Sequence, residues 1–156
     1  MKARIIPAMS AQSFSVRLYS WDEARPEARR IRELVFVREQ GVPLELEWDE
    51  QDPRCAHALA YNAADEAVGT GRLLPDGHIG RMAVLKEWRG KGVGAVLLLA
   101  LIEQARERRH ARVRLNAQIS AASFYRRFGF EISGPQFMEA GIPHVPMQRD
   151  LTTAPG

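Results

Sequence analysis

Apolar and polar residues alternate in four short stretches of the chain, and this spacing predicts β-strands. The strands are expected at residues 14–19, 57–62, 67–74 and 79–85. Residues 64–66 and 75–77 have the composition of tight turns. Because such short turns join the last three of these strands, we expect the three to form an antiparallel meander.

The segment between the first two strands has the spacing of an amphipathic helix. Its apolar face would consist of Ala28, Ile31, Leu34 and Val35. Pro26 is expected in the first turn of this helix, and Gly41 and Pro43 would end it. The residues that follow, 44–54, are acidic and irregular.

The second half of the chain begins with a longer apolar helix. The elements expected there are a helix at 94–109, a strand at 112–116, a short helix, and strands at 137–138 and 144–151. Ser120 would cap the short helix and Gly129 would end it. Pro146 would restrict the last strand to a sheet edge or a bulge, because proline cannot donate to a β-ladder.

The element order predicts one mixed α/β domain over residues 1–156, with a central sheet and an ordered core at about 13–151. The formal charge of +3 does not require a nucleic-acid partner, and the longest apolar run, 93–102, is too short to cross a membrane. Cys55 is the only cysteine and no secretory signal is evident, so we expect a cytoplasmic protein. The scattered histidines do not have metal-ligand spacing.

A basic, glycine-rich loop, Arg89-Gly90-Lys91-Gly92-Val93-Gly94, opens the long helix. Its glycines let backbone N–H groups approach an anion, and the helix N-terminus adds partial positive charge. The loop therefore predicts a polyphosphate ligand. It lacks the lysine–hydroxyl pair that ends a nucleotide P-loop, so a nucleotide P-loop is disfavoured.

These residues resemble a known family. Arg89, Gly92 and Gly94 fill the Arg/Gln-x-x-Gly-x-Gly/Ala signature for acyl-coenzyme A in the GNAT superfamily of N-acetyltransferases, and the segments 116–118 and 122–130 resemble its next block. The likeness extends over about residues 14–151. Residues 35–43, an EQGVP-type segment, and 141–145 also resemble a bacterial subgroup of small acetyltransferases.

The resemblance implies the GNAT fold, a mostly antiparallel sheet flanked by helices and splayed between its fourth and fifth strands, with acetyl-coenzyme A in the cleft. The backbone of Met82, Ala83 and Val84 would face the pantetheine arm and the thioester, where an N–H could stabilise an oxyanion. Asn116 and Ser123 would bond the pantetheine amides or the adenine side, or else serve as caps. The pyrophosphate would be held by Arg89, Gly90, Lys91, Gly92, Val93, Gly94 and Ala95.

Tyr125 matches the family tyrosine that protonates the departing thiolate; the alternative is an aromatic residue of the core. His144 is the preferred general base, with Glu47 acting through water as the alternative, and Glu45 and His78 are further candidates. Each of these could instead be a solvated surface residue. Arg81 would pair with a carboxylate of the acceptor, or with an acidic neighbour such as Glu47.

The predicted function is transfer of an acetyl group from acetyl-coenzyme A to a primary amine, directly in a ternary complex and without a metal. The acceptor would be a small molecule or a peptide, and the acidic residues 45–52 favour a cationic one. The alternative is a non-catalytic acyl-coenzyme A-binding module. A nucleic-acid binder is disfavoured, because the arginine clusters lack interleaved aromatic residues. The last strand could pair across a homodimer.

Overall fold

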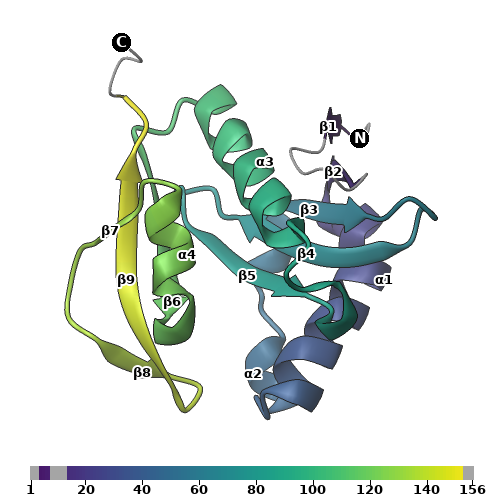
Figure 1. Ribbon diagram of the computed structural model, residues 1–156, viewed down its shortest axis with the longest axis horizontal. Coiled ribbons are helices and arrows are strands. Elements are labelled where there is room, and N and C mark those ends of the chain that lie inside the picture. Colours follow the sequence, from purple (N-terminus) through teal and green to yellow (C-terminus); the bar gives the residue numbers. More distant parts are fainter. Residues whose placement is uncertain (1–3, 8–13, 153–156) are drawn as a thin grey trace.

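The computed structural model describes residues 4–7 and 14–152, and its strands form two sheets (Figure 1). The first sheet is antiparallel, in the order β1-β2-β3-β4-β5. Its strands are β1 (Arg4–Pro7), β2 (Ser15–Tyr19), β3 (Ala56–Tyr61), β4 (Ala67–Leu73) and β5 (Ile79–Val84). The antiparallel meander predicted from the short turns is therefore confirmed. The sequence pattern did not predict β1, which precedes the expected start of the core.

The second sheet is built on β9 (Ile142–Asp150), with β6 (Arg112–Gln118) on one side of it. The short strands β7 (Glu131–Ile132) and β8 (Phe137–Glu139) pair with β9 as well. Between the two sheets, the described residues form only one isolated bridge, from His78 to Arg114. The fourth and fifth predicted strands correspond to β5 and β6. The predicted splay between them is confirmed, because β5 belongs to the first sheet and β6 to the second.

The prediction that Pro146 restricts the last strand to an edge or a bulge is wrong, because β9 has partners on both sides and pairs with β6 without a register shift. Pro146 has no N–H to donate, but its carbonyl, which points to the same side of the strand, accepts a hydrogen bond from the N–H of Ser133 at 2.9 Å. Residues 133–136 separate β7 from β8 at this point. The interruption lies in the partner strand, and β9 therefore offers no free edge for pairing with a second copy.

The helices are α1 (Trp21–Arg32), α2 (Leu44–Glu47), α3 (Val93–Glu107) and α4 (Ala122–Arg127). Short 3₁₀ turns lie at Asp52–Arg54, Lys86–Trp88 and Ile119–Ala121. Ser120 falls inside the last of these turns and Ala121 is the N-cap of α4, so the predicted Ser120 cap is wrong. Gly129, at φ +87°, ends α4 as predicted, since the N–H of Phe130 reaches the carbonyl of Tyr125 at 3.2 Å.

The first helix begins earlier than predicted. Its N-cap is Ser20, whose backbone N–H donates to the Glu23 carboxylate at 3.3 Å, so Pro26 lies in the second turn rather than the first. The helix then continues as a π-helical segment, Glu33–Glu39. The wider π turns change which residues face the sheet. Val35 is buried, but Leu34 is 40% exposed, so its predicted place on the apolar face is wrong.

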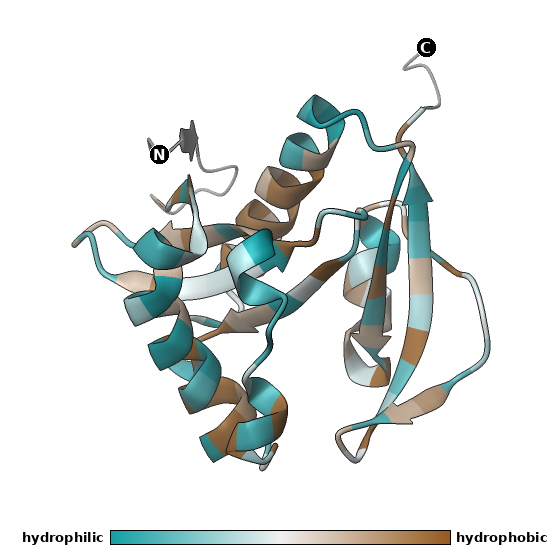
Figure 2. Cartoon of the chain, turned by 180° about the vertical axis from the view of Figure 1, so that it is seen from behind, coloured by the Kyte–Doolittle hydropathy of each residue, from teal (hydrophilic) through white to brown (hydrophobic). Residues whose placement is uncertain are grey.

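Helices α1 and α3 cover opposite faces of the first sheet (Figure 1). Side chains alternate along β3, so that Ala58 and Ala60 pack with α3 while Leu59 packs with α1. Helix α3 is apolar along most of its length (Figure 2). It lies so close to β4 that a Cβ on Gly69 would come within 2.9 Å of Leu97 Cδ1. In the part of the chain that the structure describes, no helix has both the length and the hydropathy needed to span a membrane.

Candidate functional site

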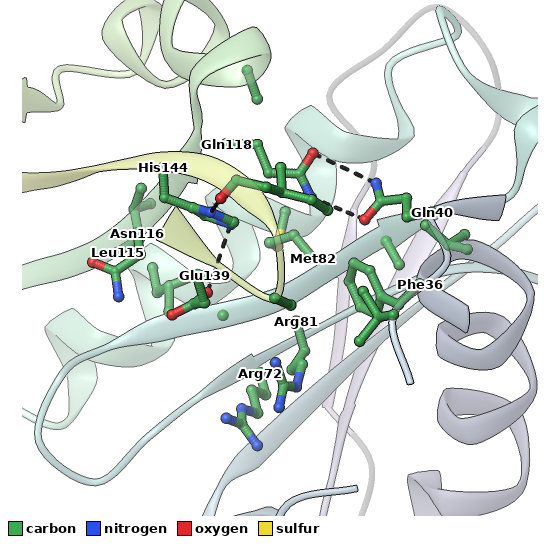
Figure 3. Close-up of a pocket in the computed structure, with 18 of the residues that line it drawn as sticks. Phe36, Gln40, Arg72, Arg81, Met82, Leu115, Asn116, Gln118, Glu139 and His144 are labelled. Atoms are coloured by element: carbon green, nitrogen blue, oxygen red, sulfur yellow. Dashed lines mark hydrogen bonds and ion pairs between the residues drawn. The ribbon is translucent and has the colours of Figure 1, made fainter. Parts of the chain in front are cut away.

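A cavity of about 760 Å³ lies where the two sheets part (Figure 3). Both sheets, the π-helical segment and α4 contribute to its walls. Its lining includes Phe36, Gln40, Glu47, Arg72, Arg81, Met82, Ala83, Val84, Asn116, Gln118, Tyr125 and His144. The predicted residues Tyr125, His144, Glu47 and Arg81 thus meet in one cavity, although they come from segments far apart in the sequence. Residues 90–95 of the glycine-rich loop do not line it.

A β-bulge in β5 forms one wall of the cavity. Thr70 pairs with Ala83 and Arg72 with Gly80, so Arg81 and Met82 together face only Gly71. Arg81 has a φ of +50°, in the left-handed region. The bulge takes this stretch of backbone out of the regular ladder beside the cavity. Met82, Ala83 and Val84 all line the cavity.

The glycine-rich loop leads directly into α3. Gly90 has a φ of +75° and Gly92, the N-cap residue, a φ of +94°, conformations that other residues adopt at an energetic cost. The first turn of α3 contains no acidic residue. Val93 is 1% exposed, so its side chain packs in the core and does not contact a ligand. A Cβ on Gly94 would lie 3.5 Å from Phe124 Cζ, which places this end of the helix against α4.

The two charged side chains of the loop, Arg89 and Lys91, differ in their contacts with other residues. Arg89 lines the cavity, but its guanidinium group pairs with Glu39, at 2.7 Å from Nη2 to Oε1, and donates from Nε to the carbonyl of Val84 at 3.0 Å. The hydrogen bond from Arg89 lowers the pKa of Glu39. Lys91 lies 5.9 Å from the centre of the Trp88 ring. Sequence reasoning missed Glu39, because no local pattern connects residues fifty positions apart.

Tyr125 lines the cavity from α4 and also contacts the core. Its ring lies 5.1 Å from that of Phe124 and 5.9 Å from that of Phe130, centre to centre. Burial raises the pKa of the phenol to about 12. The phenol therefore keeps its proton throughout the neutral range, as a proton donor must.

His144 lies on β9 and is buried, which excludes the surface alternative for this residue. Its Nδ1 is 2.7 Å from the carbonyl oxygen of Ile142, and its ring stacks on Phe137. Since a carbonyl only accepts, Nδ1 carries the hydrogen and the neutral ring has its lone pair on Nε2. The Nε2 atom is 3.6 Å from a carboxylate oxygen of Glu139, as Figure 3 shows. Sequence reasoning did not identify Glu139.

Glu47 is buried and paired with Arg32. The same guanidinium group donates to both carboxylate oxygens of Asp52 at 3.0 Å. The second carboxylate oxygen of Glu47 is buried without a hydrogen-bond partner. Of the other expected residues, Asn116 and His78 line the cavity, whereas Glu45 and Ser123 are exposed and do not.

The acidic segment at residues 45–52 faces arginines. Asp52 accepts from Arg72 at 2.8 Å as well as from Arg32, and Asp49 accepts from Arg72 at 2.6 Å. Arg81 reaches the same oxygen of Asp49 only at 3.4 Å. Glu45 and Glu50 are exposed outside the cavity lining. Because the two carboxylates of the segment that line the cavity, Glu47 and Asp49, are paired with arginines, they do not offer an acceptor the free negative charge on which the preference for a cationic acceptor depended.

A pair of side-chain amides spans the cavity. Gln118, at the end of β6, donates to Gln40 at 3.0 Å, and Gln40 donates back at 3.5 Å (Figure 3). Gln40 follows the π-helical segment, so the pair connects the helical layer beside the first sheet with the second sheet.

Residues 36–151 match the family model described as an acetyltransferase (GNAT) domain. The chain belongs to the GNAT acetyltransferase family. This GNAT protein is 38% identical over 133 residues to the uncharacterized N-acetyltransferase YjcF of Bacillus subtilis, an alignment that covers 83% of this chain and 94% of YjcF. It is 39% identical over 132 residues to YyaT of the same organism, covering 81% of this chain and 88% of YyaT.

Solved structures agree with this assignment. Escherichia coli ElaA and an acyl-CoA N-acyltransferase from Pseudomonas aeruginosa each match with a TM-score of 0.78 and 27% identity, covering 88% of this chain and 99% of theirs. The GNAT protein is therefore an acyltransferase by family, of a fold that uses acyl-coenzyme A. Within the described residues, no cluster of three or more His, Cys, Asp or Glu side chains could hold a metal ion.

Proposed function

We propose that the protein transfers the acetyl group of acetyl-coenzyme A directly to a primary amine while both substrates are bound. The observation that carries this proposal is the meeting of a protonated phenol, Tyr125, and an imidazole with a lone pair on Nε2, His144, in one cavity. A proton donor and a proton acceptor that reach the same space are what aminolysis of a thioester requires.

The residues fit a coenzyme A thioester as donor substrate. The left-handed glycines and the absence of acid in the first turn of α3 leave the backbone N–H groups of residues 90–95 available to a pyrophosphate. Asn116, which lines the cavity, would bond a pantetheine amide, and Ser123, exposed on α4, would serve the adenine side. Arg89 would hold the loop in place through Glu39 and Val84.

His144 would accept the proton that the acceptor ammonium must lose before it attacks. The Glu139 carboxylate is close enough to stabilise the imidazolium that results. Glu47 is the weaker candidate for this role, because its protonation would disrupt a buried ion pair with Arg32. The amine nitrogen then bonds to the thioester carbon, and a backbone N–H of the β5 bulge would stabilise the oxyanion.

Tyr125 would act when the carbon–sulfur bond breaks and the thiolate leaves. A phenol with a pKa of about 12 gives up its proton reluctantly to a thiolate whose conjugate acid has a pKa of ~8.5 in water. However, the burial that raises the pKa of Tyr125 also acts on a thiolate beside it, which brings the two values closer. The phenol therefore acts as a hydrogen-bond donor from the start of bond cleavage and as the proton source at its end, and the second proton of the former amine nitrogen then restores the phenol.

Free thiol release with a panel of amines tests this proposal. We expect turnover with at least one primary amine, and double-reciprocal plots that intersect when both substrates are varied. Parallel plots would instead indicate a covalent acetyl-enzyme. Tight binding of acetyl-coenzyme A without turnover of any amine would favour the non-catalytic module.

A further inference from the structure

The end of the cavity near α2 contains a cluster of six buried or half-buried charged side chains. Three are arginines and three are carboxylates: Arg32, Arg72, Arg81, Glu47, Asp49 and Asp52. Four of the six, Glu47, Asp49, Arg72 and Arg81, line the cavity directly. Figure 3 shows Arg72 and Arg81 together, apart from His144 and Glu139.

The pairing inside this cluster is uneven. Arg32 bonds to both Glu47 and Asp52, and Arg72 bonds to both Asp52 and Asp49 at 2.8 and 2.6 Å. Arg81 has only two long contacts, each of 3.4 Å, to the carbonyl of Leu46 and to the Asp49 oxygen that Arg72 already occupies. The carboxylates are thus committed to the first two arginines, and the charge of Arg81 is the least compensated.

Unmatched hydrogen-bond donors lie at the same place. The Nε atoms of Arg72 and Arg81 are buried and have no hydrogen-bond partner. Burial lowers the pKa of Arg81, and the neighbouring charges of Arg72 and Arg32 lower it further. Glu47 adds one buried acceptor oxygen, but its charge is compensated by Arg32. The two Nε atoms are closed to the cavity, so an anion there would contact the exposed part of the Arg81 side chain and compensate its charge.

The backbone holds Arg81 toward this end of the cavity. The residue sits in the β5 bulge at a φ of +50°, a conformation that is costly for a residue with a side chain and is found where the surroundings impose it. Its side chain is still 27% exposed, so a ligand in the cavity can reach the guanidinium fork. A guanidinium group in this situation matches a planar carboxylate, to which it donates two parallel hydrogen bonds.

We propose that the acceptor carries a carboxylate as well as its reacting amine, and that Arg81 binds this carboxylate. This inference rests on the proposed amine acetylation, with the amine at His144 and the carboxylate at the opposite charged end of the same cavity. It replaces the cationic acceptor expected from the acidic segment with an amino carboxylate, either a free amino acid or a peptide C-terminus.

The test compares each amino carboxylate with its own carboxamide, which has the same amine but no negative charge. A suitable series is glycine, β-alanine, 4-aminobutyrate and 6-aminohexanoate, with glycyl-β-alanine to distinguish a peptide from a free amino acid. We expect the wild type to prefer the carboxylate of at least one pair by about 10- to 100-fold in kcat/KM, the range of a charge-assisted hydrogen bond.

The variant Arg81→Gln should remove this preference by raising KM for the carboxylate alone, while coenzyme A affinity is unchanged. Arg81→Lys should retain part of the preference, because it keeps the charge without the fork. Arg54→Gln is the matched control, since Arg54 is exposed on a neighbouring turn and does not line the cavity. Thermal unfolding of each variant verifies that it is folded.

Direct binding separates this inference from the proposed activity. The increase in melting temperature with each carboxylate or carboxamide, measured with coenzyme A present, needs no turnover. Carboxylate-specific stabilisation that Arg81→Gln abolishes, without acetylation, would support the inference and contradict the proposed reaction. Acetylation of amines with no preference for a carboxylate, or a preference that survives in Arg81→Gln, would overturn the inference and leave the reaction standing.

Discussion

Tyr125 and His144 are prepared for proton transfer in different ways. Aromatic neighbours surround the phenol of Tyr125 and keep it protonated, whereas two polar neighbours, the Ile142 carbonyl and Glu139, orient the ring of His144. The sequence pointed to both residues, Tyr125 through a family motif and His144 through its chemistry. It could not supply Glu139, because that contact depends on the β8–β9 hairpin bringing the two residues together.

Replacing Tyr125 by Phe should lower kcat by about 100-fold, the usual contribution of one general acid, and change coenzyme A affinity by less than about threefold. The ring and its contacts with Phe124 and Phe130 remain, so the fold should be retained. Single-turnover rates and equilibrium binding measure the two effects separately. A rate equal to that of the wild type would remove Tyr125 from the role of proton donor.

The raised pKa of Tyr125 also predicts the alkaline limb of the pH–rate profile. The active form of this residue is the protonated phenol, and a pKa of about 12 means that the proton is retained two units above the ordinary value of ~10. The rate should therefore not fall through ionisation of Tyr125 at about pH 10. Rates at saturating substrate, with circular dichroism at each pH, check this. A decline centred near pH 10 that Tyr125→Phe lacks would contradict it.

At the scale of elements, local sequence patterns predicted the structure correctly where it depends on residues that are close in the sequence. Alternation and short turns were sufficient for the meander, and Gly129 was sufficient for the end of α4. They failed where the element continues into something less common, as when α1 becomes a π-helix and exposes Leu34. They also failed at Pro146, where the outcome depends on a break in the neighbouring strand rather than in β9 itself.

The loop before α3 gives a prediction at this scale that separates charge from backbone strain. Gly92 has a φ of +94°, so any side chain there costs about 1 kcal/mol of stability. Gly92→Ala should lower stability by that amount and weaken coenzyme A binding modestly. Gly92→Glu should lower stability similarly but weaken binding at least tenfold more than Gly92→Ala, because its carboxylate would face the proposed pyrophosphate site. Calorimetric titration measures the coenzyme A affinity of both variants. Equal affinities would contradict the assignment of the loop as the pyrophosphate site.

At the scale of the molecule, two sheets meet at one isolated bridge and enclose the cavity between them. This division came from the resemblance to a family, since alternation along a strand does not say where a sheet separates. The charged cluster beside the cavity could not be predicted from local sequence either, because Arg32, Glu47 and Arg72 come together only when α1, α2 and β4 pack.

The amide pair of Gln40 and Gln118 should measurably couple the two sides of the cavity. In a double-mutant cycle with Gln40→Ala and Gln118→Ala, we expect a coupling of about 0.5–1 kcal/mol in the free energy of unfolding, the net value of such hydrogen bonds. Urea denaturation measures it. The exposed Gln51→Ala, combined with Gln118→Ala, is the control and should be additive. Additivity in the first cycle as well would mean that the two amides do not interact in solution.

The order of strands along the chain has a consequence for how the protein is made. Each sheet comes from one continuous stretch, the first ending at Val84 and the second beginning at Arg112, and α3 makes the single passage between them. On the ribosome, the first sheet can close before the second has emerged. Until residues 112–150 follow, apolar side chains of α3 that later pack on the second sheet remain exposed to water. The nascent chain is therefore most prone to aggregation between the completion of α3 and the pairing of β6 with β9.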